Sequence, residues 1–190
     1  MRAVRCFLAV EIPAGIARKA TRVGRKLEET GAKIRLVETE NLHLTTNFLG
    51  DVTTEDLVDI SRAAIDVAER HSPFTLELSG CGAFPEISRA RIAWIGAGQG
   101  SSPFCDLQRD LANRLADIGF PPDRTKQFHP HLTLGRIQHP TDSLIEVMSR
   151  LAEENESLGD VPVDEVVVYA STLDRTGPKY TIIGRAPLVG

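Results

Sequence analysis

The chain has 190 residues, of which 42% are hydrophobic and 25% are charged, and its formal net charge is −4. This composition is that of a soluble globular protein with one sizeable core, or with two lobes that share an interface. A negative net charge argues against binding of long nucleic acids, which usually requires a basic surplus. The basic residues stand in small groups, which favour recognition of a small phosphorylated group or an RNA end; these groups are Arg89 with Arg91, Arg124 with Lys126, and Arg175 with Lys179.

The cysteines and the hydrophobic runs indicate the compartment. Cys6, Cys81 and Cys105 are widely spaced, odd in number and without a C-x-x-C motif, which favours reduced thiols in a reducing compartment. The apolar run "CFLAV" near the start is too short for a signal peptide, and no stretch approaches the roughly 20 residues of a membrane span. We therefore expect a cytoplasmic protein without a membrane partner.

The hydrophobic pattern predicts alternating strands and helices along the chain. In the first half we expect a strand at 5–12, a helix at 13–31, strands at 34–38 and 42–50, a helix at 53–71 capped by Thr53 or Thr54, and a strand at 74–84. In the second half we expect a strand at 90–98, a helix at 102–120, a strand at 131–137, a helix at 142–157 capped by Asp142 or Ser143, and strands at 163–173 and 179–188 joined as a hairpin.

This order contains an internal repeat. Each half predicts a strand, a helix, a strand that contains His-Leu-Thr, a helix and a strand. No Pro/Ser-rich linker separates the halves. An α+β fold of two lobes packed as one body is the simplest interpretation.

The two His-Leu-Thr triplets define the candidate site. On a strand, residues i and i+2 share a face, so His43 and Thr45 point one way and Leu44 the other. His131 and Thr133 repeat the arrangement. If the lobes face each other, a cleft between them receives two imidazoles and two hydroxyls.

This set of groups suits the hydrolysis of a strained phosphodiester. In-line displacement at phosphorus needs a base that takes a proton from the attacking water and an acid that protonates the leaving oxygen. Histidine fills both roles because its ordinary pKa is about 6.5. The threonine hydroxyls can donate hydrogen bonds to the phosphoryl oxygens, whose charge must be stabilised in the transition state. This chemistry needs no metal.

Further residues have alternative interpretations. Arg136 reaches the phosphate only if its strand bulges at Gly135, because strict alternation turns it away from the cleft. Phe128 can stack on a base and Tyr180 can line the cleft, although core packing is the commoner fate of such residues. His129, His131 and nearby His139 resemble a zinc-binding set, but no fourth ligand is apparent. "GAGQG" at 96–100 lacks the spacing of a dinucleotide-binding loop.

The chain resembles the two-histidine phosphoesterase superfamily, and within it the RNA 2′,3′-cyclic phosphodiesterases, also called 2′–5′ RNA ligases. The resemblance covers nearly the whole chain and is carried by "RCFLAVEIP", "NLHLTTNFLGDV", "GAFPEISRARIAWIGAG", "FHPHLTLGR" and "STLDRTGPKYTIIGRAPL". Two residues depart from the family pattern. Thr46 stands where an apolar residue is usual, and Gly135 replaces an alanine. Both changes affect the shape of the cleft rather than its histidines and threonines.

The resemblance implies a single bilobal α+β domain over residues 1–190, in which two antiparallel sheets flank a central cleft and the helices lie outside. One lobe is expected from both chain ends and the other from the middle. His43 is implied as proton donor and His131 as proton acceptor in opening a 2′,3′-cyclic phosphate on RNA or a nucleotide to a 2′-phosphate. Attack by a 5′-hydroxyl reverses the reaction and joins RNA ends. No cofactor, no metal and no obligatory protein partner are expected, and the protein is expected to be a monomer.

Two other functions remain open at this point. The same histidines and threonines suit a phosphodiesterase for another cyclic phosphate, such as that of ADP-ribose. A non-catalytic module could also use the cleft only to bind nucleotides or RNA ends, although binding alone does not need two titratable imidazoles.

Overall fold

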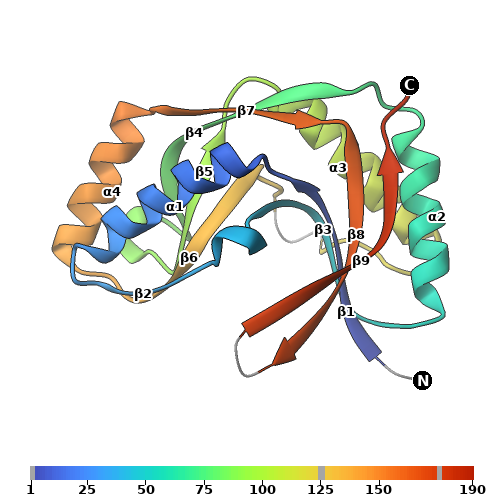
Figure 1. Cartoon of the computed structure of the whole chain (residues 1–190), viewed down its shortest axis with the longest axis horizontal. Coiled ribbons are helices and arrows are strands. Elements are labelled where there is room, and N and C mark those ends of the chain that lie inside the picture. The colour runs from blue at the N-terminus through green and yellow to red at the C-terminus, as the bar shows by residue number, and fades with distance from the viewer. Residues whose placement is uncertain (1–2, 124–126, 175–176) are drawn as a thin grey trace.

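A computed structural model describes residues 3–123, 127–174 and 177–190 (Figure 1). Its strands form two antiparallel sheets. The first sheet has the order β3-β1-β8-β9 and the second has the order β2-β6-β5-β4-β7. The strands are β1 (Ala3–Glu11), β2 (Lys33–Leu36), β3 (His43–Thr53), β4 (Phe74–Phe84), β5 (Ile92–Ala97), β6 (His131–His139), β7 (Ser157–Val163), β8 (Glu165–Asp174) and β9 (Gly177–Pro187).

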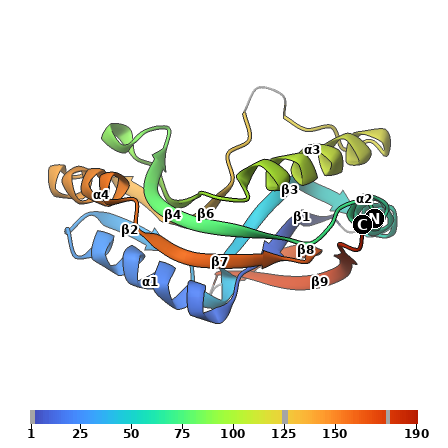
Figure 2. The same ribbon diagram turned by 90° about the horizontal axis from the view of Figure 1, so that it is seen from above.

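The helices cover the outer faces of the sheets. They are α1 (Ala14–Glu28), α2 (Asp56–Ala68), α3 (Ser101–Asp117) and α4 (Asp142–Glu154), with short 3-10 turns η1 (Thr39–Asn41) and η2 (Ile87–Arg89). Helix α2 packs on the first sheet, whereas α1 and α4 pack on the second. Figure 2 shows α1 and α3 on opposite sides of the strands. The expected α+β class with outer helices is therefore confirmed.

The internal repeat is visible in how the strands pair. In the first half β1 pairs antiparallel with the His-Leu-Thr strand β3, and in the second half β5 pairs antiparallel with the His-Leu-Thr strand β6. The last strand of each half then joins the sheet of the other half, because β4 pairs with β5 and β8 pairs with β1. This exchange ties the two halves together.

The chain also crosses early from one sheet to the other. The first sheet takes its strands from residues 3–11, 43–53, 165–174 and 177–187, whereas α1, which follows β1, packs on the second sheet and β2 belongs to it. Strand β2 pairs with β6 at the edge of that sheet. Of the segment 14–36, Arg35 and Leu36 of β2 line the cavity between the sheets.

One strand of the structure was missing from the sequence prediction. The predicted helix at 142–157 ends at Glu154, where Asn155 takes a left-handed conformation with φ of 44°, and β7 follows at once. Gly159 and Pro162 disfavour a strand in the interior of a sheet. Strand β7 lies at the sheet edge, where a proline without an N–H is tolerated.

Of the two predicted helix caps, the one at α4 was wrong by one residue. Thr141 caps α4, because its hydroxyl accepts a hydrogen bond from the Leu144 N–H at 3.2 Å. Helix α2 begins at Asp56, and the predicted Thr53 caps it in the manner of a capping box: its hydroxyl accepts a hydrogen bond of 3.3 Å from the Asp56 N–H, and its own N–H donates one of 2.8 Å to the Asp56 carboxylate. The predicted hairpin is confirmed as β8 paired with β9.

The largest set of contacting buried side chains extends through both sheets. It includes Cys6 and Leu44 from the first sheet and Cys81 and Leu132 from the second. No helix among the described residues is long and apolar enough to cross a membrane.

Candidate active site

The two His-Leu-Thr strands approach each other between the sheets. Strand β3 is the edge strand of the first sheet, and it contacts β6 of the second. The predicted alternation is confirmed in both copies, since Leu44 and Leu132 are fully buried in the core. The histidine and threonine of each copy lie on the other face of the strand and are only partly buried.

Each of these strands carries a bulge at the residue after its threonine. In β3, Thr45 pairs with Ala9 and Asn47 pairs with Leu8, so Thr46 is left over. In β6, Leu134 is left over in the same way opposite β5. A bulge changes which face the later residues occupy.

The bulges turn a matching pair of side chains outward. Arg136 lies five positions after His131 and is exposed, while Ile137 is buried. The sequence analysis expected Arg136 to face the cleft only if its strand bulges at Gly135. The strand does bulge, one residue earlier, at Leu134. Phe48 lies five positions after His43 and is 60% exposed. It is the repeat counterpart of Arg136, and the sequence analysis missed it.

The two departures from the family pattern have local explanations. The Thr46 side chain is buried, and its hydroxyl donates a hydrogen bond of 3.1 Å to the Leu8 carbonyl. This bond satisfies the buried hydroxyl. Gly135 allows β2 to approach closely, because a Cβ there would lie only 2.7 Å from the Arg35 carbonyl oxygen.

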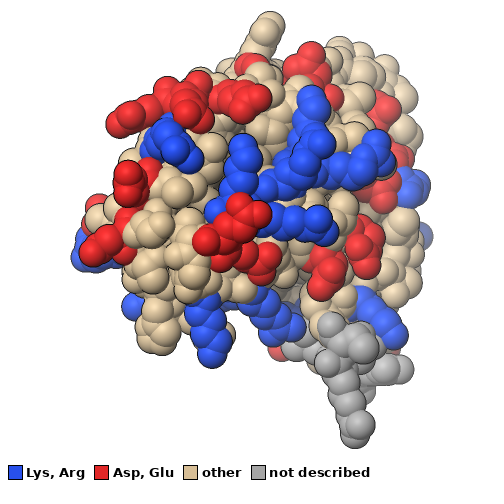
Figure 3. Space-filling view, turned by 60° about the vertical axis from the view of Figure 1, so that its left-hand side comes forward, with Lys and Arg blue, Asp and Glu red and all other residues tan. Residues whose placement is uncertain are grey.

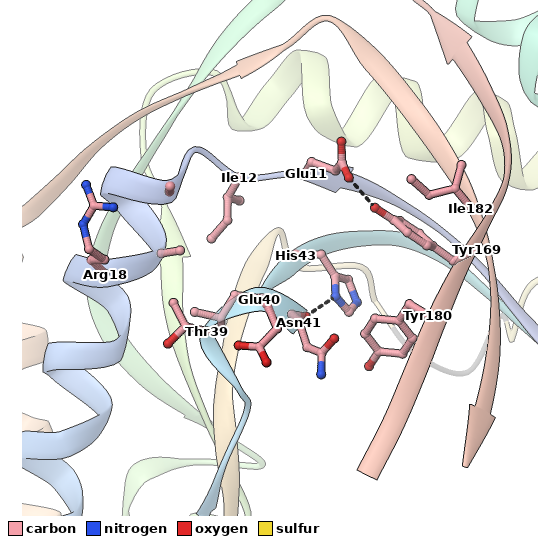
Figure 4. A pocket seen from close by; sticks show the side chains of 13 residues that line it. Glu11, Ile12, Arg18, Thr39, Glu40, Asn41, His43, Tyr169, Tyr180 and Ile182 are labelled. Atoms are coloured by element: carbon pink, nitrogen blue, oxygen red, sulfur yellow. Dashed lines mark hydrogen bonds between the residues drawn. The ribbon is translucent and has the colours of Figure 1, made fainter. Parts of the chain in front are cut away.

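His43 lies in an aromatic environment. Its ring stacks on Phe7 at a centroid distance of 4.8 Å and meets the edge of Tyr180 at 5.4 Å. Its Nδ1 donates a hydrogen bond of 2.7 Å to the Asn41 carbonyl oxygen (Figure 4). Burial lowers the pKa of His43 below its ordinary value, and the hydrogen bond to Asn41 opposes this shift.

His131 has an equivalent environment in the second sheet. Phe84 meets its ring in a T-shaped contact at 4.9 Å, and Trp94 lies 6.3 Å away. Its Nδ1 donates a hydrogen bond of 2.6 Å to the carbonyl oxygen of His129. Burial is the main cause that lowers the pKa of His131 as well.

These matching bonds set the tautomer of both rings. A carbonyl oxygen can only accept a hydrogen bond, so each Nδ1 carries a proton. In the neutral ring the Nε2 is then an acceptor, and in the charged ring it is a donor. Each histidine can therefore exchange a proton through Nε2 while its ring is held in place.

Most of the predicted site residues line one cavity of about 390 Å³, which we call the inter-sheet cavity. His43, Thr45, Thr133, Arg136 and Tyr180 all lie in its wall. The wall also includes Arg5, Arg35 and Phe48, and the Arg5 guanidinium lies 5.3 Å from the centre of the Phe48 ring.

His131 faces an adjoining cavity of about 1010 Å³, which shares Thr45 and Phe48 with the inter-sheet cavity. Phe128 lies in the wall of this second cavity, and it also stacks on the buried ring of Phe104 at 6.1 Å. Phe128 is therefore placed both to stack on a base in the cavity and to pack against the core. His131 and Phe128 are not brought into the same cavity as Tyr180.

A third cavity of about 640 Å³ also borders His43, on the side away from the inter-sheet cavity (Figure 4). We call it the His43 cavity. Glu11, Glu40, Tyr169 and Arg18 contribute to its wall. Glu11 accepts hydrogen bonds from Tyr169 at 2.8 Å and from Arg185 at 3.0 Å.

No metal-binding cluster was found within residues 3–123, 127–174 and 177–190: there is no group of three or more histidine, cysteine or acidic side chains that could hold an ion. His139 is exposed at the end of β6 and lines none of the three cavities. The basic residues Arg124, Lys126 and Arg175 from the sequence analysis lie outside the described residues.

Apart from Tyr180, the sequence analysis did not identify the aromatic residues that surround the histidines. Phe7 lies in β1 and Trp94 in β5, which pair with the His-Leu-Thr strands, and Phe84 lies in β4, which pairs with β5; these pairings form only on folding. The strand alternation could have suggested Phe7, whose side chain shares a face with neither Cys6 nor Leu8 in the core.

The family model for the 2′-5′ RNA ligase superfamily matches residues 15–175. The chain belongs to this superfamily. A Methanothermobacter thermautotrophicus protein named RNA 2′,3′-cyclic phosphodiesterase is 36% identical, and the match covers 94% of this chain and 95% of that one. An Escherichia coli protein of the same name is 33% identical over 95% of this chain and 94% of its own.

Two solved structures are similar over all or nearly all of the chain. The structure of Escherichia coli LigT in complex with 3′-AMP has a TM-score of 0.78 and 28% identity, with all of both chains covered. A Thermus thermophilus protein gives a TM-score of 0.80 at 25% identity, with 98% of each chain covered. These similarities confirm the predicted family and its bilobal fold.

Proposed function

We propose that this chain is an RNA 2′,3′-cyclic phosphodiesterase that opens the cyclic phosphate of RNA or nucleotide ends to a 2′-phosphate. The observation that carries the proposal is the repeated His-Leu-Thr arrangement, in which two imidazoles with matching Nδ1 hydrogen bonds border adjoining cavities. The relatives named for this activity support it, as does the complex of LigT with a nucleotide.

In this proposal the two histidines divide the proton transfers. His131 accepts the proton of an attacking water through its neutral Nε2, and His43 donates a proton from Nε2 to the departing 3′ oxygen. Attack and departure occur on opposite sides of phosphorus. The ribose therefore lies on the His43 side, and the nucleophile enters from the cavity beside His131.

The phosphate would be held in the inter-sheet cavity. Thr45 and Thr133 each bring a hydroxyl to its wall, and Arg136 brings a guanidinium, which is suited to bind phosphoryl oxygens at two points. Tyr180 would line the side of the cavity next to His43. Phe128 is placed to contact a nucleophile that enters beside His131.

The same geometry allows 2′–5′ RNA ligation, which is the reverse of 2′–5′ bond cleavage. When the 5′-hydroxyl of a second RNA replaces water in the cavity beside His131, its oxygen attacks phosphorus and a 2′–5′ bond forms. The proton goes to His131, and no ATP is consumed. We further propose that the reaction needs neither metal nor cofactor, that the protein acts as a monomer without a protein partner, and that it works in the cytoplasm. The described cysteines are free thiols, which fits a reducing compartment.

Substitution of either histidine tests the proposal. General acid–base groups contribute about 10²–10⁴-fold each, so His43→Ala and His131→Ala should each lose at least about 10²-fold in kcat on 2′,3′-cyclic AMP. The assay contains EDTA, and chromatography identifies 2′-AMP or 3′-AMP as product. His139→Ala is the matched control and should retain wild-type turnover.

Three outcomes would contradict the proposal. They are near-wild-type turnover in either substituted protein, a requirement for added metal, and 3′-AMP as the sole product. Tight binding of 2′-AMP without any turnover by the wild-type protein would instead favour a non-catalytic binding module.

A further inference from the structure

Helix α1 presents a row of arginines on one exposed face. Arg18, Arg22 and Arg25 are spaced four and three residues apart, so they lie on the same side of the helix. All three are exposed, while the opposite side of α1 is buried on the second sheet. Figure 3 shows Lys and Arg side chains gathered on this face of the molecule, with acidic residues around them.

The charge of this row is not balanced within the protein. In the part of the chain that the structure describes, Arg18, Arg22 and Arg25 form no ion pair. Arginines on the other helices do so: Arg62 pairs with Asp59, Arg109 with Asp106, and Arg150 with Glu154. Like charges at these helical spacings repel one another by a few tenths of a kcal/mol per pair. A row of unpaired arginines on a chain of net charge −4 therefore indicates an anionic partner.

The row leads to the candidate active site. A groove of about 510 Å³ runs along α1 and is lined by Arg18, Arg22 and Arg25. It shares Arg18 and Thr39 with the His43 cavity. Helix α1 is also fixed to η1 here, because the hydroxyls of Thr21 and Thr39 share a hydrogen bond of 2.8 Å. A continuous surface thus connects His43 to the arginines.

The acidic residues of the His43 cavity indicate where phosphates would lie. Glu40 and Glu11 stand in its wall (Figure 4), and although Glu11 is compensated by Arg185, neither carboxylate favours a phosphate. Backbone phosphates are more favourably placed beyond this cavity, against α1. The row from Arg18 to Arg25 is about 10 Å long at 1.5 Å per residue.

We propose that the α1 arginine row binds the phosphodiester backbone of the RNA strand that carries the cyclic phosphate. This inference rests on the proposed function, which places the ribose on the His43 side of phosphorus. The rest of that strand then leaves the active site past His43, towards α1. The row gives the enzyme a preference for RNA ends over cyclic mononucleotides, which are too short to reach Arg22 and Arg25.

The experiment compares a short RNA that ends in a 2′,3′-cyclic phosphate with 2′,3′-cyclic AMP as substrates. In the double variant Arg22→Gln/Arg25→Gln, KM for the RNA should rise on the order of tenfold, while KM and kcat for the mononucleotide stay unchanged. The variant should also reduce the slope of log Kd against log salt for RNA by about 1.4, at about 0.7 per phosphate contact. Fluorescence anisotropy measures this binding without turnover.

The control variant Arg62→Gln/Arg109→Gln removes the same charge from α2 and α3, which pack away from α1, and should leave RNA binding unchanged. Equal loss in both variants, or wild-type RNA binding by Arg22→Gln/Arg25→Gln, would overturn the proposal. Loss of RNA binding only in Arg5→Gln/Arg35→Gln would overturn it too, because the strand would then follow the inter-sheet cavity. A wild-type protein that turns over neither substrate contradicts the proposed function. In that case the binding measurements still show whether the arginine row binds RNA.

Discussion

At the scale of single residues, the two histidines are held by equivalent hydrogen bonds and aromatic contacts, but their proposed roles are opposite. Each Nδ1 is held by a backbone carbonyl two residues earlier, and each ring is enclosed by aromatic side chains. Burial favours the neutral imidazole, so the pKa of each falls below the ordinary value of 6.5. A neutral ring suits His131 as a base, whereas His43 must be protonated to act as an acid.

This gives a prediction for the pH dependence of kcat/KM on 2′,3′-cyclic AMP. Activity falls on the acidic side as His131 gains a proton and on the alkaline side as His43 loses one. Because both pKa values are lowered, the maximum should lie below about pH 6.5, and the rate should already decline between about pH 7 and 8. Residual activity of His43→Ala should lose the alkaline limb, and that of His131→Ala the acidic limb. A maximum above pH 7.5, or exchanged limbs, would refute these assignments.

The sequence was sufficient for residues whose position follows from strand alternation. His43, Thr45, His131 and Thr133 share faces as expected because a period of two places them there. The outward position of Arg136 depends on a bulge, which no local pattern specified. The arginine row of α1 could have been predicted from the spacing of four and three residues on a helix. The sequence analysis considered only basic residues close together in the sequence, and therefore missed it.

At the scale of elements, β2 and β6 approach so closely that only glycine fits between them. A Cβ on Gly135 would contact backbone atoms of Arg35 and Leu36, at 2.7 Å from the carbonyl oxygen and 3.0 Å from the Cα. Strand β7, which the sequence analysis missed, also depends on its place in the fold. It forms because it lies at the edge of the sheet, although its residues have a low preference for strands.

Gly135→Ala should therefore destabilise this protein by about 1–3 kcal/mol, because backbone rather than a flexible side chain must move. Urea denaturation followed by circular dichroism measures the free energy of unfolding. Gly15→Ala is the control: it lies in α1 with nothing within 4 Å of the added Cβ, and should be neutral or stabilising by up to about 1 kcal/mol. Wild-type stability of Gly135→Ala would show that β2 is free to shift.

At the scale of the whole molecule, the question is whether the two sheets form one folding unit. Each half of the chain gives a strand to the sheet of the other half, and a single set of buried side chains extends through both sheets. The sequence suggested the repeat but could not show the exchange, because strand pairing between distant segments is decided by the tertiary fold. The single domain over residues 1–190 remains a prediction.

Two buried thiols provide the test of that prediction, because one lies in each sheet. Cys6 in β1 is 0% exposed and Cys81 in β4 is 6% exposed, and burial raises the pKa of each thiol to about 12. Neither should react with an alkylating reagent until the structure around it opens. If the sheets unfold as one unit, the alkylation rates of Cys6 and Cys81, followed by peptide mass spectrometry, should rise together with urea and give the same free energy of opening. Alkylation of one cysteine at clearly lower urea would mean that its sheet opens alone, and the exchanged strands would then not be enough to make the two lobes a single domain.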